Sequence, residues 1–186
     1  AAVADGQSVI DNISLGDDVM STVRCLRALG ADITIDGTCA TVRPITTPND
    51  NVTLNCGNSG TTARLLAGLV CGLGVKATFV GDKSLSARPM DRVIEPLTAM
   101  GAHFRLREGA LFETLGGKLL GCTLKSKVNS AQVKSAVLLA AMFADGATTY
   151  TELVPTRDHT ERLMAATGVD ICGTTVQKSR PHAMRI

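Results

Sequence analysis

A layout that occurs three times along the chain constrains its fold more than any other feature of the sequence. Each copy contains an apolar segment that ends on a glycine, a β-branched strand, an amphipathic helix that ends on another glycine, and two short strands. The opening glycines are Gly6, Gly74 and Gly146, spaced 68 and 72 residues apart, and each is predicted to end a helix. The pattern predicts one supersecondary unit used three times. The alternative is an ordinary α/β domain whose glycine spacing is accidental.

The elements after each opening glycine follow the same order. Strands are predicted at 8–10, 77–80 and 148–151, and the amphipathic helices that follow them end at Gly30, Gly101 and Gly168. Pro96 is expected to kink or shorten the second of these helices. Asp36-Gly37 and Glu108-Gly109 each separate two short β-rich runs and predict hairpin turns.

Two further helices are predicted at 61–73 and 131–145, each just before an opening glycine. The second is apolar nearly all round, which indicates a central helix that is buried on every side. We therefore expect helices inside the molecule and strands outside them. The first copy retains only the last turn of the corresponding helix, at residues 1–5. We expect that this helix has been cut and that the chain is a piece of a longer protein.

Composition narrows the possible partners. The 186 residues are 45% hydrophobic and 19% charged, which is enough apolar material for a globular core. A net charge of +2, with no Trp and 3% aromatic residues, does not fit a general nucleic-acid binder. Six cysteines without a CxxC pair predict reduced thiols in the cytoplasm, and no cluster of His, Cys or Asp predicts a metal. No apolar run reaches the roughly 20 residues of a membrane span, and no leader is expected.

A glycine-rich polar segment opens the helix predicted at 61–73. Gly57-Asn58-Ser59-Gly60-Thr61-Thr62 directly follows a predicted strand at 52–54. Glycines let the backbone approach a ligand, and the free amides of a helix N-terminus favour phosphate or carboxylate. The run lacks the Lys-Ser/Thr ending of a P-loop. It predicts an anion site of another kind, and the alternative is an ordinary helix cap made by Asn, Ser and Thr.

A second polar start opens the helix predicted from Ala131. Gln132 lies in its first turn, where it either caps the helix or faces a ligand, and Lys134 is expected to supply charge to that ligand. Arg88 and Arg157 each lie in a loop before an outer helix. Arginine suits bidentate binding of phosphate or carboxylate, and the alternative for each is a solvated or salt-bridged side chain.

Four motifs, in order and spacing, resemble those of the 5-enolpyruvylshikimate-3-phosphate synthase family. They are Gly57-Asn58-Ser59-Gly60-Thr61-Thr62-Ala63-Arg64-Leu65, Arg88-Pro89-Met90, Ser130-Ala131-Gln132-Val133-Lys134-Ser135-Ala136 and Thr156-Arg157-Asp158-His159-Thr160-Glu161-Arg162. The resemblance covers the whole chain but only the N-terminal domain of that two-domain family. It implies that an upstream Lys-Ser-x-Ser-x-Arg motif and the C-terminal domain are missing.

The resemblance also implies a fold and a reaction. The fold is a single α/β domain over residues 1–186, an inside-out, barrel-like arrangement of three βαβαββ units with the first unit truncated. The reaction transfers the enolpyruvyl group of phosphoenolpyruvate to the 5-hydroxyl of shikimate 3-phosphate, in the cytoplasmic shikimate pathway that leads to aromatic amino acids. It needs no metal or other cofactor, and the family is the target of glyphosate.

Roles for individual residues follow from the same resemblance. Shikimate 3-phosphate would contact Ser130, Ala131, Gln132, Thr156 and Arg157. Phosphoenolpyruvate would face Gly60, Arg88 and Gln132, and the loop would be shaped by Asn58, Ser59, Thr61 and Arg64. Thr156 stands where the family often has Ser, and Ala131 stands where some members carry a second Ser. No residue of this chain is assigned a catalytic role, because the acid–base carboxylates of the family lie in the absent domain.

Two alternatives remain open from the sequence. The chain resembles, within the same superfamily, a UDP-N-acetylglucosamine enolpyruvyl transferase, although the reactive Cys loop of that enzyme is not found. It is otherwise a non-catalytic fragment that binds a phosphorylated ligand or is inert. The expected partners are the two small substrates and the missing C-terminal domain, in the same chain or in another, with no nucleic acid and no membrane.

Overall fold

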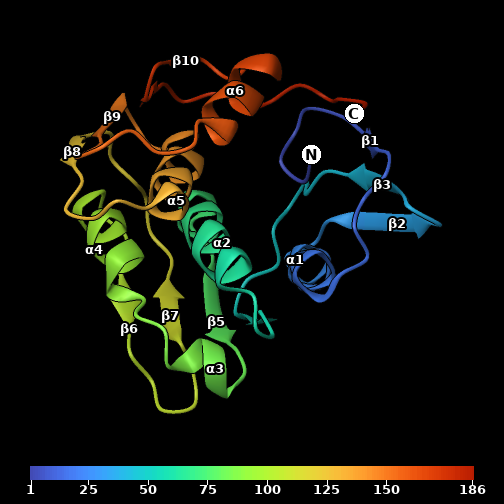
Figure 1. Ribbon diagram of the computed structural model, residues 1–186, viewed down its shortest axis with the longest axis horizontal. Helices are drawn as coiled ribbons and strands as arrows, with labels where there is room; N and C mark the ends of the chain where they lie inside the picture. The colour runs from blue at the N-terminus through green and yellow to red at the C-terminus, as the bar shows by residue number, and fades with distance from the viewer.

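The strands form three separate sheets, in a computed structural model that describes residues 1–186 (Figure 1). The first sheet has the order β1 (Ser8–Ile10), β3 (Cys39–Arg43), β2 (Asp32–Asp36). The second has the order β4 (Val52–Asn55), β5 (Lys76–Val80), β7 (Phe112–Leu115), β6 (Phe104–Arg105). The third has the order β8 (Thr123–Lys125), β9 (Thr148–Thr151), β11 (Thr175–Val176), β10 (Ile171–Cys172).

Six helices connect and cover these sheets. They are α1 (Asp17–Ala28), α2 (Gly60–Leu73), α3 (Lys83–Ser86), α4 (Asp91–Ala99), α5 (Ala131–Ala141) and α6 (His159–Ala166). In Figure 1, α2 and α5 lie side by side in the middle of the larger lobe, whereas β1, β2, β3 and α1 form a smaller lobe beside it. None of these helices is long and apolar enough to cross a lipid bilayer.

The second and third sheets share one connectivity. In each, a strand is followed by a central helix, a parallel neighbouring strand, an outer helix and an antiparallel hairpin, with β4 parallel to β5 and β8 parallel to β9. The first sheet has the hairpin but no full parallel strand on its outer edge. Val9 in β1 instead forms a parallel bridge with Arg185 of the C-terminal tail.

The contact between α2 and α5 is unusually close. A Cβ atom on Gly68 would lie 2.0 Å from the carbonyl oxygen of Ala136, so only a glycine permits this approach of the two helices. Most residues of both helices are buried. This agrees with the all-round apolar pattern of the sequence, and the two helices belong to one continuous core that also includes residues of α1 and all three sheets.

The structure corrects several predictions. The fold is mixed α/β, as expected, and its strands form three open sheets. The helix predicted to 145 ends at Ala141, because the chain turns at Met142, and the left-handed Gly146 lies beyond the turn. Gly74 alone of the three opening glycines caps a helix. Pro96, which was expected to kink or shorten its helix, lies inside α4, and that helix is nine residues long.

Candidate functional site

The start of α2 is a tight turn in which Gly60 and Thr62 are buried and Thr61 is exposed. Asn55 ends β4, Gly57 takes a positive φ of 57°, and Ser59 forms the N-cap by accepting a hydrogen bond from the Thr62 amide at 3.2 Å. Ser59 is 1% exposed. Its hydroxyl is therefore committed to capping the helix, which is the ordinary role that the sequence left open.

Two guanidinium groups lie over the first residue of α2. A Cβ atom on Gly60 would come within 2.9 Å of Arg64 Nη1 and 3.1 Å of Arg88 Nη1. Neither arginine forms an ion pair with a carboxylate. The positive end of the α2 dipole and two unpaired cations thus meet at a residue without a side chain, an arrangement that attracts an anion.

Burial and neighbouring charge both act on Arg64. Desolvation lowers the pKa of Arg64, and the positive charges of Arg88 and Arg92 lower it further. An arginine nevertheless stays protonated at neutral pH, because its ordinary pKa lies far above neutrality. An anion that joins these side chains would therefore reduce the repulsion among them.

Gln132 connects the two helix starts. Its Oε1 accepts a hydrogen bond from Arg64 Nη1 at 2.8 Å, and its Nε2 donates to Thr61 Oγ1 at 2.9 Å. The first turn of α5 is therefore attached to the first turn of α2. Arg64 Nη2 also donates to the Pro89 carbonyl at 3.3 Å, which fixes the segment that follows Arg88.

Asp82 is a site residue that sequence reasoning missed. Its Oδ2 accepts a hydrogen bond from Asn58 Nδ2 at 2.7 Å, and Asn58 Oδ1 in turn accepts one from Arg88 Nη2. Hydrogen bonds from the backbone of Leu85 and from Asn58 hold the pKa of Asp82 below its ordinary value. Asp82 therefore orients Arg88 through Asn58. The available signal was its place as N-cap of the short helix α3.

The residues predicted to bind shikimate 3-phosphate lie in two segments, the start of α5 and the loop before α6. Ser130 is the N-cap of α5 and accepts from the Val133 amide at 3.4 Å, with Ala131 as the first helical residue. Thr156 donates to Glu152 Oε1 through its backbone amide, at 3.1 Å, and through its hydroxyl. Arg157 is exposed and has no hydrogen-bond partner within the chain.

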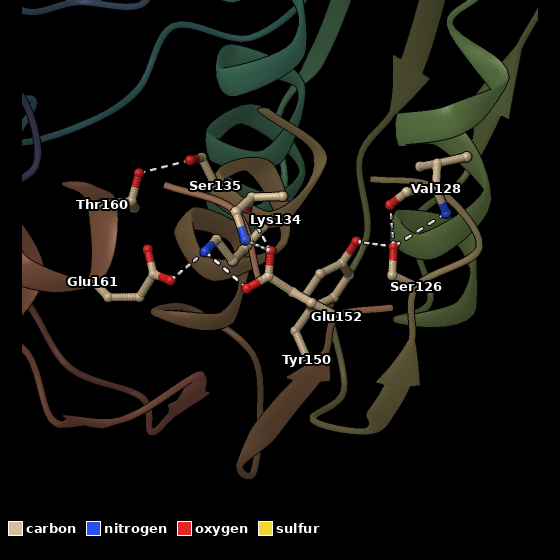
Figure 2. Close-up of polar contacts among 9 residues, drawn as sticks. Ser126, Val128, Lys134, Ser135, Tyr150, Glu152, Thr160 and Glu161 are labelled. Atoms are coloured by element: carbon tan, nitrogen blue, oxygen red, sulfur yellow. Dashed lines mark hydrogen bonds and ion pairs between the residues drawn. The ribbon is translucent and has the colours of Figure 1, made fainter. Parts of the chain in front are cut away.

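Lys134 does not supply charge to a ligand, contrary to the sequence prediction. Its side chain is 1% exposed and forms ion pairs with Glu152 Oε2 at 3.0 Å and Glu161 Oε1 at 2.5 Å (Figure 2). Desolvation alone would lower the pKa of Lys134, but the two carboxylates outweigh it and raise the pKa. Its positive charge is thus used inside the protein.

Two hollows lie beside the helix starts without containing Gly60 or Gln132. One, of about 330 Å³, includes Arg88 and continues along α4 to Leu111. The other, of about 320 Å³, lies between α4 and β8 and has Tyr150 in its wall. The candidate site itself is formed by the two helix starts, where Gly60 is buried and Ser130, Ala131 and Gln132 are half-buried. No three His, Cys, Asp or Glu side chains are grouped so that they could hold a metal ion.

Comparison with known proteins identifies the family. The family model described as EPSP synthase (3-phosphoshikimate 1-carboxyvinyltransferase) matches residues 1–182. The chain belongs to the EPSP synthase family. Relatives named 3-phosphoshikimate 1-carboxyvinyltransferase are 45% identical over 192 residues in Geobacillus kaustophilus and 48% identical over 179 residues in Parvibaculum lavamentivorans. These alignments cover 99% and 91% of this chain.

A solved EPSP synthase structure supports the same assignment. The enzyme from Acinetobacter baumannii is 34% identical and superimposes with a TM-score of 0.88, over 100% of this chain and 44% of that one. The chain spans 45% and 39% of the lengths of the Geobacillus and Parvibaculum relatives. As a member of the EPSP synthase family, it therefore corresponds to less than half of the proteins that it resembles.

Proposed function

We propose that this chain forms one side of the substrate cleft of an enolpyruvyl transferase, in which phosphoenolpyruvate donates its enolpyruvyl group to the 5-hydroxyl of shikimate 3-phosphate. Membership of the EPSP synthase family supports the reaction class. The observation that carries the proposal is the pair of unpaired guanidiniums, Arg64 and Arg88, over Gly60 at the start of α2.

Phosphoenolpyruvate binds at the start of α2. Its phosphate and carboxylate are the anions that two guanidiniums and the helix amides bind, and Gly60 lets both guanidiniums approach the helix start. Asn58 holds Arg88 in place, and Gln132 holds Arg64. The role of these residues is to neutralise charge that moves onto the phosphate when it leaves.

Shikimate 3-phosphate binds at the start of α5. Its phosphate accepts hydrogen bonds from the hydroxyl of Ser130, the backbone amide of Ala131 and the guanidinium of Arg157, with Thr156 on the facing loop. Gln132 lies between the two ligands, since it is already attached to the first turn of α2. The two substrates are thereby placed side by side, which converts an encounter in solution into a reaction within one complex.

The bond changes follow from this placement. The 5-hydroxyl gives up its proton as its oxygen bonds to C2 of phosphoenolpyruvate, and a proton joins the neighbouring methylene carbon, which gives a tetrahedral intermediate. Phosphate then leaves from C2 and the methyl carbon loses a proton, so the double bond is restored. We assign no proton-transfer group to this chain, and the remainder of the protein, in the same chain or another, supplies it together with the second side of the cleft.

The architecture proposed for the chain is one domain of three βαβαββ units, located in the cytoplasm. The matching order of the second and third sheets supports two complete units, β4 to β7 and β8 to β11. The hairpin of β2 and β3 with β1 and α1 supports a first unit that lacks its opening strand and central helix.

The test combines binding with turnover. We expect phosphoenolpyruvate to shift amide signals at Gly60 and Arg64 in ¹⁵N NMR spectra of the 186-residue chain, and Arg88→Ala to weaken this binding by about tenfold or more. Arg43→Ala is the control, because Arg43 pairs with Asp32 on the far sheet. We expect no phosphate release by the chain alone and measurable release when the missing parts of a relative are supplied. Unchanged binding in Arg88→Ala would refute the assignment, and binding without restored turnover would identify a binding fragment instead.

A further inference from the structure

Lys134 is a charged side chain buried in α5, one of the two apolar central helices of the protein. It is 1% exposed on α5, yet it has two carboxylate partners, Glu152 and Glu161, from elements on either side (Figure 2). Burying an ammonium group is unfavourable unless it is paired and hydrogen-bonded, and an apolar residue of similar size is often at least as stable. Stability by itself therefore does not account for a lysine at this position.

Glu152 connects this lysine to a residue of the proposed substrate site. One oxygen, Oε2, accepts from Lys134 at 3.0 Å. The other, Oε1, accepts from the Thr156 amide at 3.1 Å and from the Thr156 hydroxyl. A single carboxylate thus closes the loop between β9 and α6 and attaches it to α5.

Lys134 lies near the start of α5, close in sequence to the α5 residues of the proposed substrate site. It comes two residues after Gln132 and four after Ser130. The path from Ser130 along α5, through Lys134 and Glu152, to Thr156 consists entirely of buried or half-buried groups. This path connects the two segments that, in the proposed function, hold shikimate 3-phosphate.

The second carboxylate acts on the other end of the loop. Glu161 Oε1 pairs with Lys134, and its neighbour Thr160 bonds to Ser135 at 2.6 Å, so the first turn of α6 is also attached to α5. Glu161 Oε2 is buried without a hydrogen-bond partner. Two carboxylates share one ammonium, so removing Lys134 would leave like charges together and drive the loop away from α5.

We propose that Lys134 is a positioning residue: through Glu152 it sets Thr156 and Arg157 opposite Ser130 and Gln132, so that one phosphorylated substrate is held from α5 and from the 152–158 loop together. The inference rests on the proposed function for the identity of that substrate. The position of the 152–158 loop does not depend on the identity of the substrate, so loop position and substrate binding are measured separately.

The experiment compares substitutions that differ in whether they reach Thr156. Lys134→Met replaces the ammonium by an apolar side chain of similar length, and Glu152→Ala removes both the Lys134 and the Thr156 contacts. Glu161→Gln is the matched control, because it removes an equivalent charge next to Lys134 but does not contact Thr156. Glu152→Gln keeps an acceptor oxygen for Thr156 that Glu152→Ala lacks, so it tests whether this acceptor restores the position of Thr156.

Three quantities are measured on the 186-residue chain and these variants. They are the hydrogen-exchange protection of the Thr156 amide, the dissociation constants of shikimate 3-phosphate and phosphoenolpyruvate by calorimetry, and the thermal midpoint. In Lys134→Met and Glu152→Ala we expect the Thr156 protection to be lost. We also expect the affinity for shikimate 3-phosphate to fall about tenfold or more, with that for phosphoenolpyruvate within about twofold. Glu161→Gln keeps both properties, and Glu152→Gln, which keeps an acceptor for Thr156 but loses the ion pair with Lys134, gives a protection between those of the wild type and Glu152→Ala.

Other outcomes overturn the proposal. Retained Thr156 protection in Lys134→Met would show that the lysine does not position the loop. A different outcome is that the affinities for both substrates fall in proportion to the thermal midpoint, in Glu161→Gln as much as in the other variants. That outcome would show that Lys134 only stabilises the fold. If wild-type chain binds no shikimate 3-phosphate, the proposed function fails, and the Thr156 amide still decides whether Lys134 positions the loop. If Lys134→Met does not fold, Glu152→Gln decides the question, because it removes the ion pair with Lys134 and keeps an acceptor for Thr156; wild-type Thr156 protection in Glu152→Gln would then overturn the proposal.

Discussion

Gly60 illustrates how a residue without a side chain determines what approaches the start of α2. Its neighbours in space are the ends of two flexible arginines, and no backbone atom lies close to the position of a Cβ. Added volume at this position therefore displaces charge and leaves the helix intact. An alanine is also about 1 kcal/mol more favourable than glycine within a helix.

For Gly60→Ala we expect unchanged or slightly raised stability together with weaker anion binding. The new methyl group would lie 2.9 Å from Arg64 Nη1 and 3.1 Å from Arg88 Nη1, so both guanidiniums must move away from the helix start. Phosphoenolpyruvate affinity should fall by about tenfold, a loss of one charge-assisted hydrogen bond. Calorimetric titration measures it, with Gly16→Ala as control, because a Cβ there meets only Ser14 Oγ, at 3.3 Å. Equal affinities in Gly60→Ala and the wild type would contradict this placement of the arginines.

Glu152 makes the stability of the folded protein depend on pH in the acid range. Burial alone would raise the pKa of Glu152, but the hydrogen bonds from Thr156 and the charge of Lys134 outweigh it and hold the pKa below its ordinary value. The unfolded chain consequently binds this proton more readily than the folded one. The stabilisation is present above a pH of about 4.3 and is lost as the pH falls through the lower pKa of the folded state.

The free energy of unfolding should therefore decrease less on acidification in Glu152→Gln than in the wild type. Urea unfolding between pH values of about 6 and 3 measures the difference, since the amide cannot take up the proton. Asp5, Asp82 and Glu113 also have lowered pKa values. They therefore preserve part of the dependence of the unfolding free energy on pH in both proteins. Parallel curves for the two proteins would exclude a folded-state role for the Glu152 charge.

Between elements, the crossing of α2 and α5 determines where both proposed substrate segments lie. The two helices start close together because Gly68 allows their backbones to approach, and Gln132 then reaches Thr61 and Arg64. A wider crossing would separate the start of α5 from that of α2. Helix packing far from the ligands thus controls the geometry of the site.

Gly68→Ala should destabilise the protein much more than Gly72→Ala. A Cβ on Gly68 would lie 2.0 Å from the Ala136 backbone, whereas one on Gly72 would lie 2.7 Å from the half-buried Phe143 ring, which can rotate. Overpacking against backbone costs about 1–3 kcal/mol or more. Urea unfolding of both variants provides the comparison, and equal losses would indicate that the helices separate without penalty.

For the whole molecule, the C-terminal tail joins the small lobe to the rest. Val9 donates to the Met184 carbonyl at 2.8 Å, and the Ile186 amide donates to the Val9 carbonyl at 3.1 Å. His182 Nδ1 lies 2.7 Å from Asp5 Oδ2, and the His182 amide donates to the Thr167 carbonyl just after α6. The tail therefore contacts β1 and the end of α6 together.

Removing residues 181–186 should expose the outer edge of β1. We expect the amides of Val9 and Asp11 to lose hydrogen-exchange protection, because both donate to carbonyls of the tail, and the thermal midpoint to fall. Amides of the α2 core, such as Leu66, serve as the internal control, since α2 packs on α5 and not on the tail. Unchanged protection at Val9 would show that the tail does not stabilise this edge.

Sequence reasoning alone located most elements, and it proposed the start of α2 as an anion site, which stays a prediction. The strand at 148–151, the central helices and the two hairpin turns follow from local signals, namely β-branched runs, all-round apolar character and turn residues. The glycine-rich start of α2 was recognisable because helix N-termini attract anions wherever they occur. These features depend on neighbours within a few residues, and short-range pattern is sufficient for them.

Tertiary structure decided the partners of each charged group. Lys134 was expected to face a ligand, and it is buried because Glu152 and Glu161, 18 and 27 residues away, meet it from two other elements. Asp82 was not anticipated, and closure of the fold brings it to Asn58. The sequence specifies which side chains are charged, but the effect of a charge depends on which opposite charge lies within a few ångströms. That distance is set by the packing of α2, α5 and the sheets around them.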